Sequence, residues 1–105
     1  MTTENPQYHR VAATEEIAPG AGKLVEIHGR EIAVFHFGGA FFATSDMCPH
    51  RGASLVDGFL DGGKIFCPWH CFDFSLASGE CEMVPSQRIQ TYPTKVEEGE
   101  VYVLC

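Results

Sequence analysis

Basic residues are scarce in this chain, which has 7 Lys and Arg against 14 Asp and Glu and a net charge of −7. Nucleic-acid binding depends on neutralising phosphates with basic side chains, so this balance argues against such a partner. The same balance predicts repulsion from an anionic membrane surface. It is compatible with electrostatic steering toward a basic protein partner, and equally with plain solubility.

Long apolar segments are missing as well. The polar start "MTTENPQYHR" contains no apolar run and does not resemble a secretory signal. The longest apolar stretch, 32–43, is too short to cross a bilayer and is interrupted by Gly38 and Gly39. We therefore expect a cytoplasmic protein without membrane contact. Thiols stay reduced in the cytoplasm, so the five cysteines suit metal ligands and spare thiols better than a disulfide framework.

No segment shows a sustained helical period with caps, so we expect little helix beyond one short turn within 13–20. Short β-type runs between turn residues dominate instead. They predict a three-stranded meander over 23–27, 31–37 and 40–44. Near the end, 88–96 and 100–105 predict a hairpin, in which Pro93 favours an edge position or a bulge.

The length of 105 residues suits a single domain over 1–105. The middle of the chain, about 46–85, differs from the rest because glycines divide it into very short strands. We expect a β scaffold that carries this segment as an inserted subdomain, and a flexible end at residues 1–7.

Two segments in the middle of the chain, "CPHRGASLVDG" and "CPWHCFDFSLASGE", each begin with a cysteine, a proline and a nearby histidine. Four candidate metal ligands result: Cys48, His50, Cys67 and His70. Structural zinc sites pair like ligands at wider spacings, so this pattern fits zinc poorly. An iron–sulfur cluster with two cysteines on one iron and two histidines on the other matches better. A zinc-binding interaction module remains the weaker alternative.

The pattern C-x-H-x(16)-C-x-x-H resembles the Rieske 2Fe–2S signature, and the likeness extends from about Val11 to Leu104. In size and layout the chain is similar to the small Rieske ferredoxins of bacterial aromatic-ring-hydroxylating dioxygenases. The resemblance implies one Rieske-type 2Fe–2S cluster, with the two cysteines on the buried iron and the two histidines on the outer iron. It also implies an all-β Rieske fold of small antiparallel sheets with an inserted rubredoxin-like cluster-binding subdomain.

The function that the resemblance implies is one-electron transfer. The carrier would be a monomer that passes electrons from a flavin-dependent ferredoxin reductase to a terminal Rieske non-haem iron oxygenase, docking briefly at the cluster tip. We expect no enzyme activity, because the four protein ligands leave no open position and the chain has no dinucleotide motif. The alternative is a small Rieske subunit of a nitrite reductase or of another multicomponent oxidoreductase.

Some residues near the motif depart from the pattern of the family. Cys71 stands where many relatives have glycine, and we interpret it, like Cys81 and Cys105, as a spare thiol. High-potential relatives place a serine and a tyrosine two and four residues after the second histidine, where this chain has Phe72 and Phe74. Because neither phenylalanine can donate a hydrogen bond to sulfur, we predict a low reduction potential.

The remaining histidines, and the aromatic residues near the motif, are predicted to have structural or surface roles rather than to bind the metal. We expect the histidines outside the motif, His9, His28 and His36, to be structural or exposed, and Phe74 to pack beneath the cluster. Trp69 is expected to shape the docking surface.

Overall fold

The structure is a computed structural model, and it describes residues 7–48, 53–68, 73–81, 84 and 86–105. Residues 1–6 of the expected flexible end lie outside this description. Gln7 is paired: its N–H donates to the carbonyl of Cys105 at 3.2 Å, and the N–H of Cys105 donates back at 3.1 Å. Gln7 is therefore held against the last residue of the chain.

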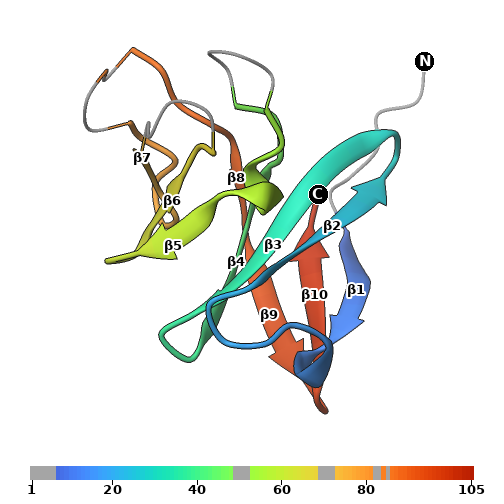
Figure 1. Cartoon of the computed structure of the whole chain (residues 1–105). Helices are drawn as coiled ribbons and strands as arrows, with labels where there is room; N and C mark the ends of the chain where they lie inside the picture. Colours follow the sequence, from blue (N-terminus) through green and yellow to red (C-terminus); the bar gives the residue numbers. More distant parts are fainter. Residues whose placement is uncertain (1–6, 49–52, 69–72, 82–83, 85) are drawn as a thin grey trace, which may run out of the picture.

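Short strands in three antiparallel sheets make up the described chain, which confirms the all-β prediction (Figure 1). The sheets have the strand orders β1-β10-β9, β2-β3-β4-β8 and β5-β6-β7. The strands are β1 (Tyr8–Ala13), β2 (Gly22–Ile27), β3 (Arg30–Phe37), β4 (Ala40–Ser45), β5 (Phe59–Asp61), β6 (Lys64–Phe66), β7 (Asp73–Ser75), β8 (Thr91–Tyr92), β9 (Thr94–Glu97) and β10 (Glu100–Leu104). Two 3-10 turns, η1 (Thr14–Glu16) and η2 (Leu55–Asp57), accompany them, and η1 falls where the short turn was expected. The described residues contain no helix with the length and apolar character that a membrane crossing needs.

The predicted meander is β2, β3 and β4, and each of its two turns consists of two residues with positive φ. The first has His28 at 53° and Gly29 at 78°, and the second has Gly38 at 62° and Gly39 at 79°. Two-residue turns of this kind match the right-handed twist of antiparallel strands, so they join neighbouring strands tightly.

Strand β3 lies between two apolar cores and contributes side chains to both. Its residues Ile32 and Val34 belong to the core between the β1-β10-β9 and β2-β3-β4-β8 sheets. Ala33 and Phe35 point the other way, into the core beneath the β5-β6-β7 sheet. The consecutive apolar residues of this strand follow from that position, because a strand covered on both faces does not alternate.

The prediction of one strand over 88–96 was wrong. Pro93 divides this segment into β8, which pairs with β4, and β9, which pairs with β10 in the other sheet. Proline has no N–H to donate and fixes its own φ, so the ladder breaks there and the chain changes sheet. The hairpin of β9 and β10 is confirmed. Strand β1, which the sequence did not predict, pairs with β10 on its other side.

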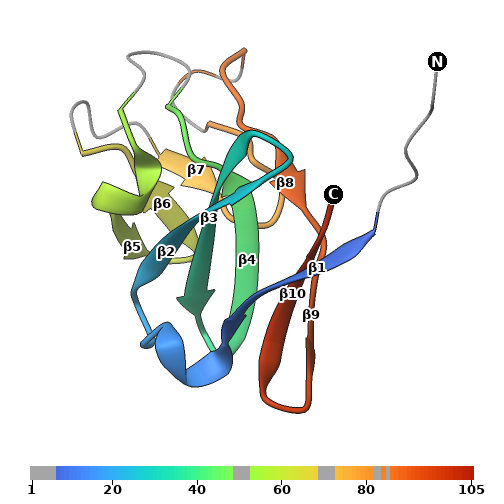
Figure 2. The ribbon, with the colours of Figure 1, turned by 90° about the vertical axis from the view of Figure 1, so that its right-hand side faces the viewer.

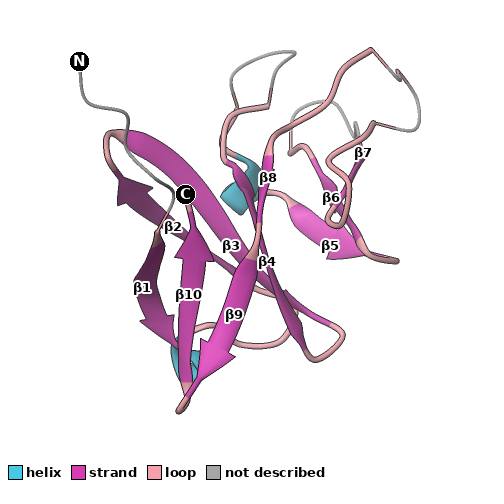
Figure 3. Ribbon diagram, turned by 180° about the vertical axis from the view of Figure 1, so that it is seen from behind, coloured by secondary structure: helices cyan, strands magenta, loops and turns pink. Residues whose placement is uncertain are grey.

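The inserted subdomain lies between β4 and β8. Because these two strands pair directly, the segment between them leaves the four-stranded sheet and returns to it. Within this segment, β5, β6 and β7 form their own sheet beside the scaffold (Figures 2 and 3). The expected insertion of a small subdomain into an antiparallel β scaffold is confirmed.

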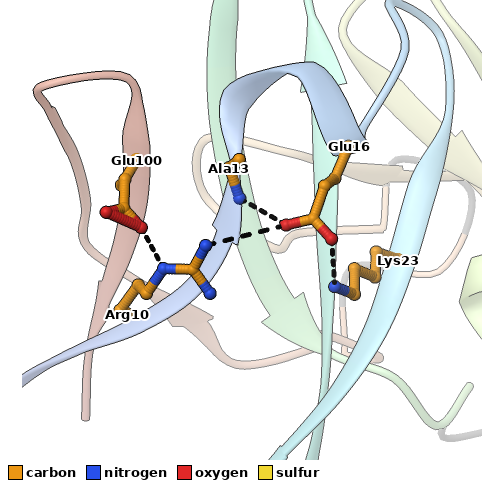
Figure 4. A network of polar contacts seen from close by, with 5 residues as sticks. All are labelled: Arg10, Ala13, Glu16, Lys23 and Glu100. Carbon is orange, nitrogen blue, oxygen red and sulfur yellow. Dashed lines mark hydrogen bonds and ion pairs between the residues drawn. The ribbon is translucent and has the colours of Figure 1, made fainter.

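A polar network around Glu16 connects the two sheets of the scaffold (Figure 4). The carboxylate of Glu16 accepts a hydrogen bond from the Ala13 N–H at 2.6 Å and contacts Lys23 Nζ at 3.5 Å and Arg10 Nη2 at 3.9 Å. Arg10 also donates from Nε to Glu100. The pKa of Glu16 is lowered, first by the Ala13 hydrogen bond and then by the charge of Lys23. The network joins β1 and β10 of one sheet to β2 of the other.

Candidate metal centre

Asp46 directly follows β4 and stands at the start of the first candidate ligand loop, the segment that contains Cys48 and His50. Its side chain is buried, and both of its carboxylate oxygens accept hydrogen bonds. Oδ2 accepts a hydrogen bond from Ser54 Oγ at 2.5 Å, and Oδ1 accepts one from the backbone N–H of Val56 at 2.9 Å. The backbone carbonyl of Asp46 also accepts from Leu55 N at 2.6 Å. One buried carboxylate thus holds the start of the loop to the residues that follow its end.

A short antiparallel pairing continues this closure up to Cys48. Met47 and Ser54 form a β-bridge, and the N–H of Cys48 donates to the carbonyl of Ala53 at 2.8 Å. Neighbouring residues in such a ladder point to opposite sides. Met47 is accordingly 60% exposed, whereas Cys48 is 0% exposed. The pairing therefore turns the Cys48 side chain into the protein.

The second candidate loop is carried by the hairpin of β6 and β7, in which Phe66 pairs with Asp73. Cys67 follows β6 directly and is also 0% exposed. Gly58 stands between η2 and β5, at the start of the β5–β6 pairing, and an added Cβ there would lie 2.0 Å from the carbonyl oxygen of Phe66. Only glycine allows that approach, so Gly58 lets the residues after η2 pack closely on the strand that leads to Cys67.

Cys48 and Cys67 belong to the same apolar core, although they come from different loops. This core also contains Leu55 and Ile65 from the subdomain and Phe35 from the scaffold. Two soft sulfur donors that belong to one apolar core fit the thiolate side of an iron–sulfur centre. His50 and His70, the other two predicted ligands, lie outside the described residues, as do Trp69, Cys71 and Phe72.

Phe74 and Cys81 are also members of this core. They face each other in an antiparallel β-bridge, and both are buried. Phe74 therefore packs in the core, and its place beneath the cluster stays a prediction. Gly79, with φ at 81°, turns the chain between them, and an added Cβ there would lie 2.1 Å from the carbonyl oxygen of Ile89. Cys105 lies elsewhere, against the scaffold core.

The three histidines outside the motif lie in the scaffold, as expected. His28 is exposed in the first meander turn, and its ring meets that of His9 edge to face at 5.0 Å. His36, in β3, stacks on Phe41 at 4.3 Å, and its Nδ1 lies 2.8 Å from the carbonyl oxygen of Ile17. These contacts give His9, His28 and His36 structural roles.

Sequence reasoning missed two charged side chains of the subdomain. One is Asp46, described above. The other is Asp73, whose Oδ2 lies 3.0 Å from Lys64 Nζ on the hairpin that carries Cys67. A carboxylate directly before a predicted ligand loop was the available signal for Asp46. Nothing comparable marked Asp73, because its burial depends on how the hairpin packs.

Comparison with known proteins places the chain in a family. The model of the Rieske 2Fe–2S domain matches residues 7–93, so the chain belongs to the Rieske domain family. Membership implies one Rieske-type 2Fe–2S cluster, in agreement with the buried pair of thiols.

Similar proteins include carriers and enzyme subunits. The chain is 37% identical over 95 residues to the 3-phenylpropionate/cinnamic acid dioxygenase ferredoxin subunit of Photorhabdus laumondii, covering 89% of this chain and 90% of that one. A chain in the complex of reduced oxygenase and oxidized ferredoxin of carbazole 1,9a-dioxygenase is 36% identical, with a TM-score of 0.82 over 90% of this chain and 99% of that one. A protein described as an NADH-dependent nitrite reductase small subunit, from Mycobacterium tuberculosis, is 25% identical, with a TM-score of 0.90 over 97% of both chains.

Proposed function

We propose that this protein is a one-electron carrier that links a flavin-dependent ferredoxin reductase to a terminal Rieske non-haem iron oxygenase in an aromatic-ring-hydroxylating system. The observation that carries the proposal is the pair of fully buried thiols, Cys48 and Cys67, in one core of a Rieske-family chain. The relatives named as ferredoxin components of dioxygenase systems support it, since they match this chain over most of their length.

The proposed ligand set is Cys48 and Cys67 on the inner iron and His50 and His70 on the outer iron. A bound Rieske cluster takes up and releases one electron at a time. The chain's own part is to enclose the two thiols in an apolar core, to close the base of the first loop through Asp46, and to let β5 pack closely on the strand before Cys67 through Gly58. A site with all ligand positions filled transfers electrons without binding a substrate, so we propose no catalytic activity.

The wider organisation follows from this role. We propose a single domain over residues 1–105 in which about 46–85 form the cluster-binding part. We further propose a cytoplasmic monomer that docks transiently through the cluster tip, around Trp69 and the two histidine ligands.

A second candidate function is the small Rieske subunit of a nitrite reductase, which the close structural match to the Mycobacterium tuberculosis protein favours. The two candidates differ in their partners. A carrier accepts electrons from a separate reductase and leaves it, whereas an enzyme subunit stays bound to its large subunit. Affinity purification of the tagged chain from its source cells, followed by size-exclusion chromatography, separates a free carrier from a stable complex.

The ligand assignment is tested by replacing each predicted ligand with alanine. The wild-type protein is expected to contain two irons and two acid-labile sulfides per chain and to show a Rieske electron paramagnetic resonance signal when reduced. The four variants, at Cys48, His50, Cys67 and His70, are expected to lose the cluster and much of their thermal stability, because metal binding and folding are coupled.

Three matched controls keep the test specific. Cys71→Ser, Cys81→Ser and Cys105→Ser each remove a thiol that is not a proposed ligand, and each is expected to retain the iron and the signal. Loss of the cluster in one of these serine variants overturns the assignment. Electron delivery is then tested by adding the holoprotein to a purified reductase and terminal oxygenase and measuring oxidation of NADH that depends on the aromatic substrate.

A further inference from the structure

Asp73 is a buried carboxylate with an incomplete set of partners. It is 7% exposed, and its Oδ2 lies 3.0 Å from Nζ of Lys64. Its other oxygen, Oδ1, is buried and receives no hydrogen bond from the residues that the structure describes. Asp46 makes the contrast clear, since each of its two oxygens accepts a hydrogen bond. Asp73 therefore keeps one buried oxygen without a hydrogen bond from the described residues, whereas both oxygens of Asp46 have a donor.

The position of Asp73 places this charge beside the second ligand loop. Asp73 is the first residue of β7 and pairs with Phe66, whose next neighbour in the chain is Cys67. Opposed Cα atoms in an antiparallel pair lie about 5 Å apart, and consecutive ones about 3.8 Å apart, so the Cα atoms of Asp73 and Cys67 are within about 9 Å. The next residue, Phe74, points into the core that holds both thiols, so the side chain of Asp73 leaves β7 on the opposite face and acts on the cluster across the hairpin rather than by contact.

The two partners of the ion pair are not equally buried. The side chain of Asp73 is 10% exposed, whereas that of Lys64 is 31% exposed. Water screens the more exposed charge more strongly, so the pair as a whole presents a negative potential to its buried side. Reduction adds one negative charge to the cluster, and a fixed negative potential nearby opposes that addition.

From these observations we propose that Asp73 and Lys64 tune the reduction potential of the cluster, with Asp73 lowering it and Lys64 partly offsetting that effect. The inference rests on the proposed function, because it requires the cluster to be bound through Cys67. Two unit charges about 10 Å apart at an effective dielectric constant of about 20 interact strongly enough to change the equilibrium constant for reduction about tenfold.

The test is a redox titration of holoprotein variants, followed by visible absorption and by electron paramagnetic resonance. Asp73→Asn preserves the shape of the side chain and removes its charge, so the equilibrium constant for reduction is expected to rise by about three- to tenfold. Lys64→Gln is expected to move it in the opposite direction by a smaller factor. The double variant is expected to lie between the two single variants.

A matched control is available at the far end of the scaffold. Glu97 forms an exposed ion pair with Lys95 at 3.6 Å on β9, so Glu97→Gln makes the same change in net charge as Asp73→Asn. It is expected to leave the equilibrium constant for reduction within about twofold of wild type, because exposed charges far from the cluster are screened.

The outcomes separate the possible roles of the pair. If the pair only fastens the β6–β7 hairpin, both variants lower the melting temperature while the potential stays unchanged, and the proposal is overturned. Should Asp73→Asn lose its cluster, Lys64→Gln decides alone, since a potential that is not lowered in that variant also overturns it. A wild-type protein without a Rieske signal instead defeats the proposed function, which is a different result.

Discussion

Ser54 donates its hydroxyl hydrogen to Oδ2 of Asp46 at 2.5 Å, across the base of the first ligand loop. The acceptor is a buried carboxylate, and it lies two residues before Cys48. This bond therefore joins the residue that follows β4 to a residue beyond Cys48. It helps to fix the position of that predicted cluster ligand.

Ser54→Ala is expected to destabilise the holoprotein by about 1.5–3 kcal/mol, because a buried charged acceptor loses one donor. The loop base should also open more often, so iron should pass to an added chelator several times faster than from wild type. Thermal melting and the rate of iron release measure the two effects.

Thr94→Val is the matched control for this prediction. Thr94 Oγ1 donates to the carbonyl of Phe41 at 2.7 Å in the scaffold, away from the ligand loops. This variant should lose stability without faster iron release. Equal rates of release from the Ser54 and Thr94 variants would show that the first loop does not depend on the Asp46–Ser54 bond.

The sequence could mark Cys48 and Cys67 as candidate ligands, because ligand chemistry restricts both the residue type and the spacing, and the structure places both in one apolar core. The Asp46–Ser54 bond was not predictable, since an aspartate and a serine eight residues apart have many possible partners and only the folded loop selects one pair. Strand β3 was predictable from its apolar run, whereas the strand change at Pro93 was not. The proline indicated a disturbed ladder, but which sheet each half joins depends on contacts distant in sequence.

The second prediction concerns the reduction potential. Rieske centres span about −150 to +300 mV, and hydrogen bonds to the cluster sulfurs are one of the main determinants. Phe74 is fully buried in the core that holds both thiols, and its ring offers no hydroxyl. We expect a midpoint near the low end, on the order of −150 mV, and little change with pH around neutrality.

Phe74→Tyr is expected to raise this midpoint, because the family resemblance implies a tyrosine at this position in high-potential members, with its hydroxyl donating a hydrogen bond to a cluster sulfur. Some loss of stability, about 1–3 kcal/mol, should accompany the tighter packing. Phe41→Tyr, in the scaffold core, adds the same hydroxyl at a distance and should leave the midpoint unchanged. Protein-film voltammetry decides the matter, and a wild-type midpoint well above zero would contradict the low-potential prediction.

The third prediction uses the net charge of −7. An acidic carrier is attracted to a basic docking surface, and added salt screens that attraction. The association rate with its reductase should therefore fall several-fold between about 0.05 M and about 0.5 M salt. Stopped-flow reduction measures this rate. Reduction by an uncharged small-molecule mediator is the control, and it should hardly change; a rate with the reductase that is equally insensitive would exclude steering.

The last prediction concerns the network that joins the two scaffold sheets. The pKa of Glu16 lies below its ordinary value of 4.5, because the Ala13 N–H and then Lys23 favour the ionised carboxylate. A group whose pKa is lowered by folding stabilises the folded state above its unfolded pKa, and this contribution disappears as the pH falls through the folded pKa.

Glu16→Gln should therefore lower the melting temperature at neutral pH, by less than Ser54→Ala does, because the ion pairs of Glu16 are exposed. The difference from wild type should stay constant down to about pH 5 and then shrink as the wild-type carboxylate takes up its proton. High salt at neutral pH should shrink it as well. Glu15→Gln makes the same charge change at the neighbouring exposed position and controls for net charge. Melting curves collected across this pH range test the sign, and a difference that grows on acidification would rule out the assigned role of Glu16.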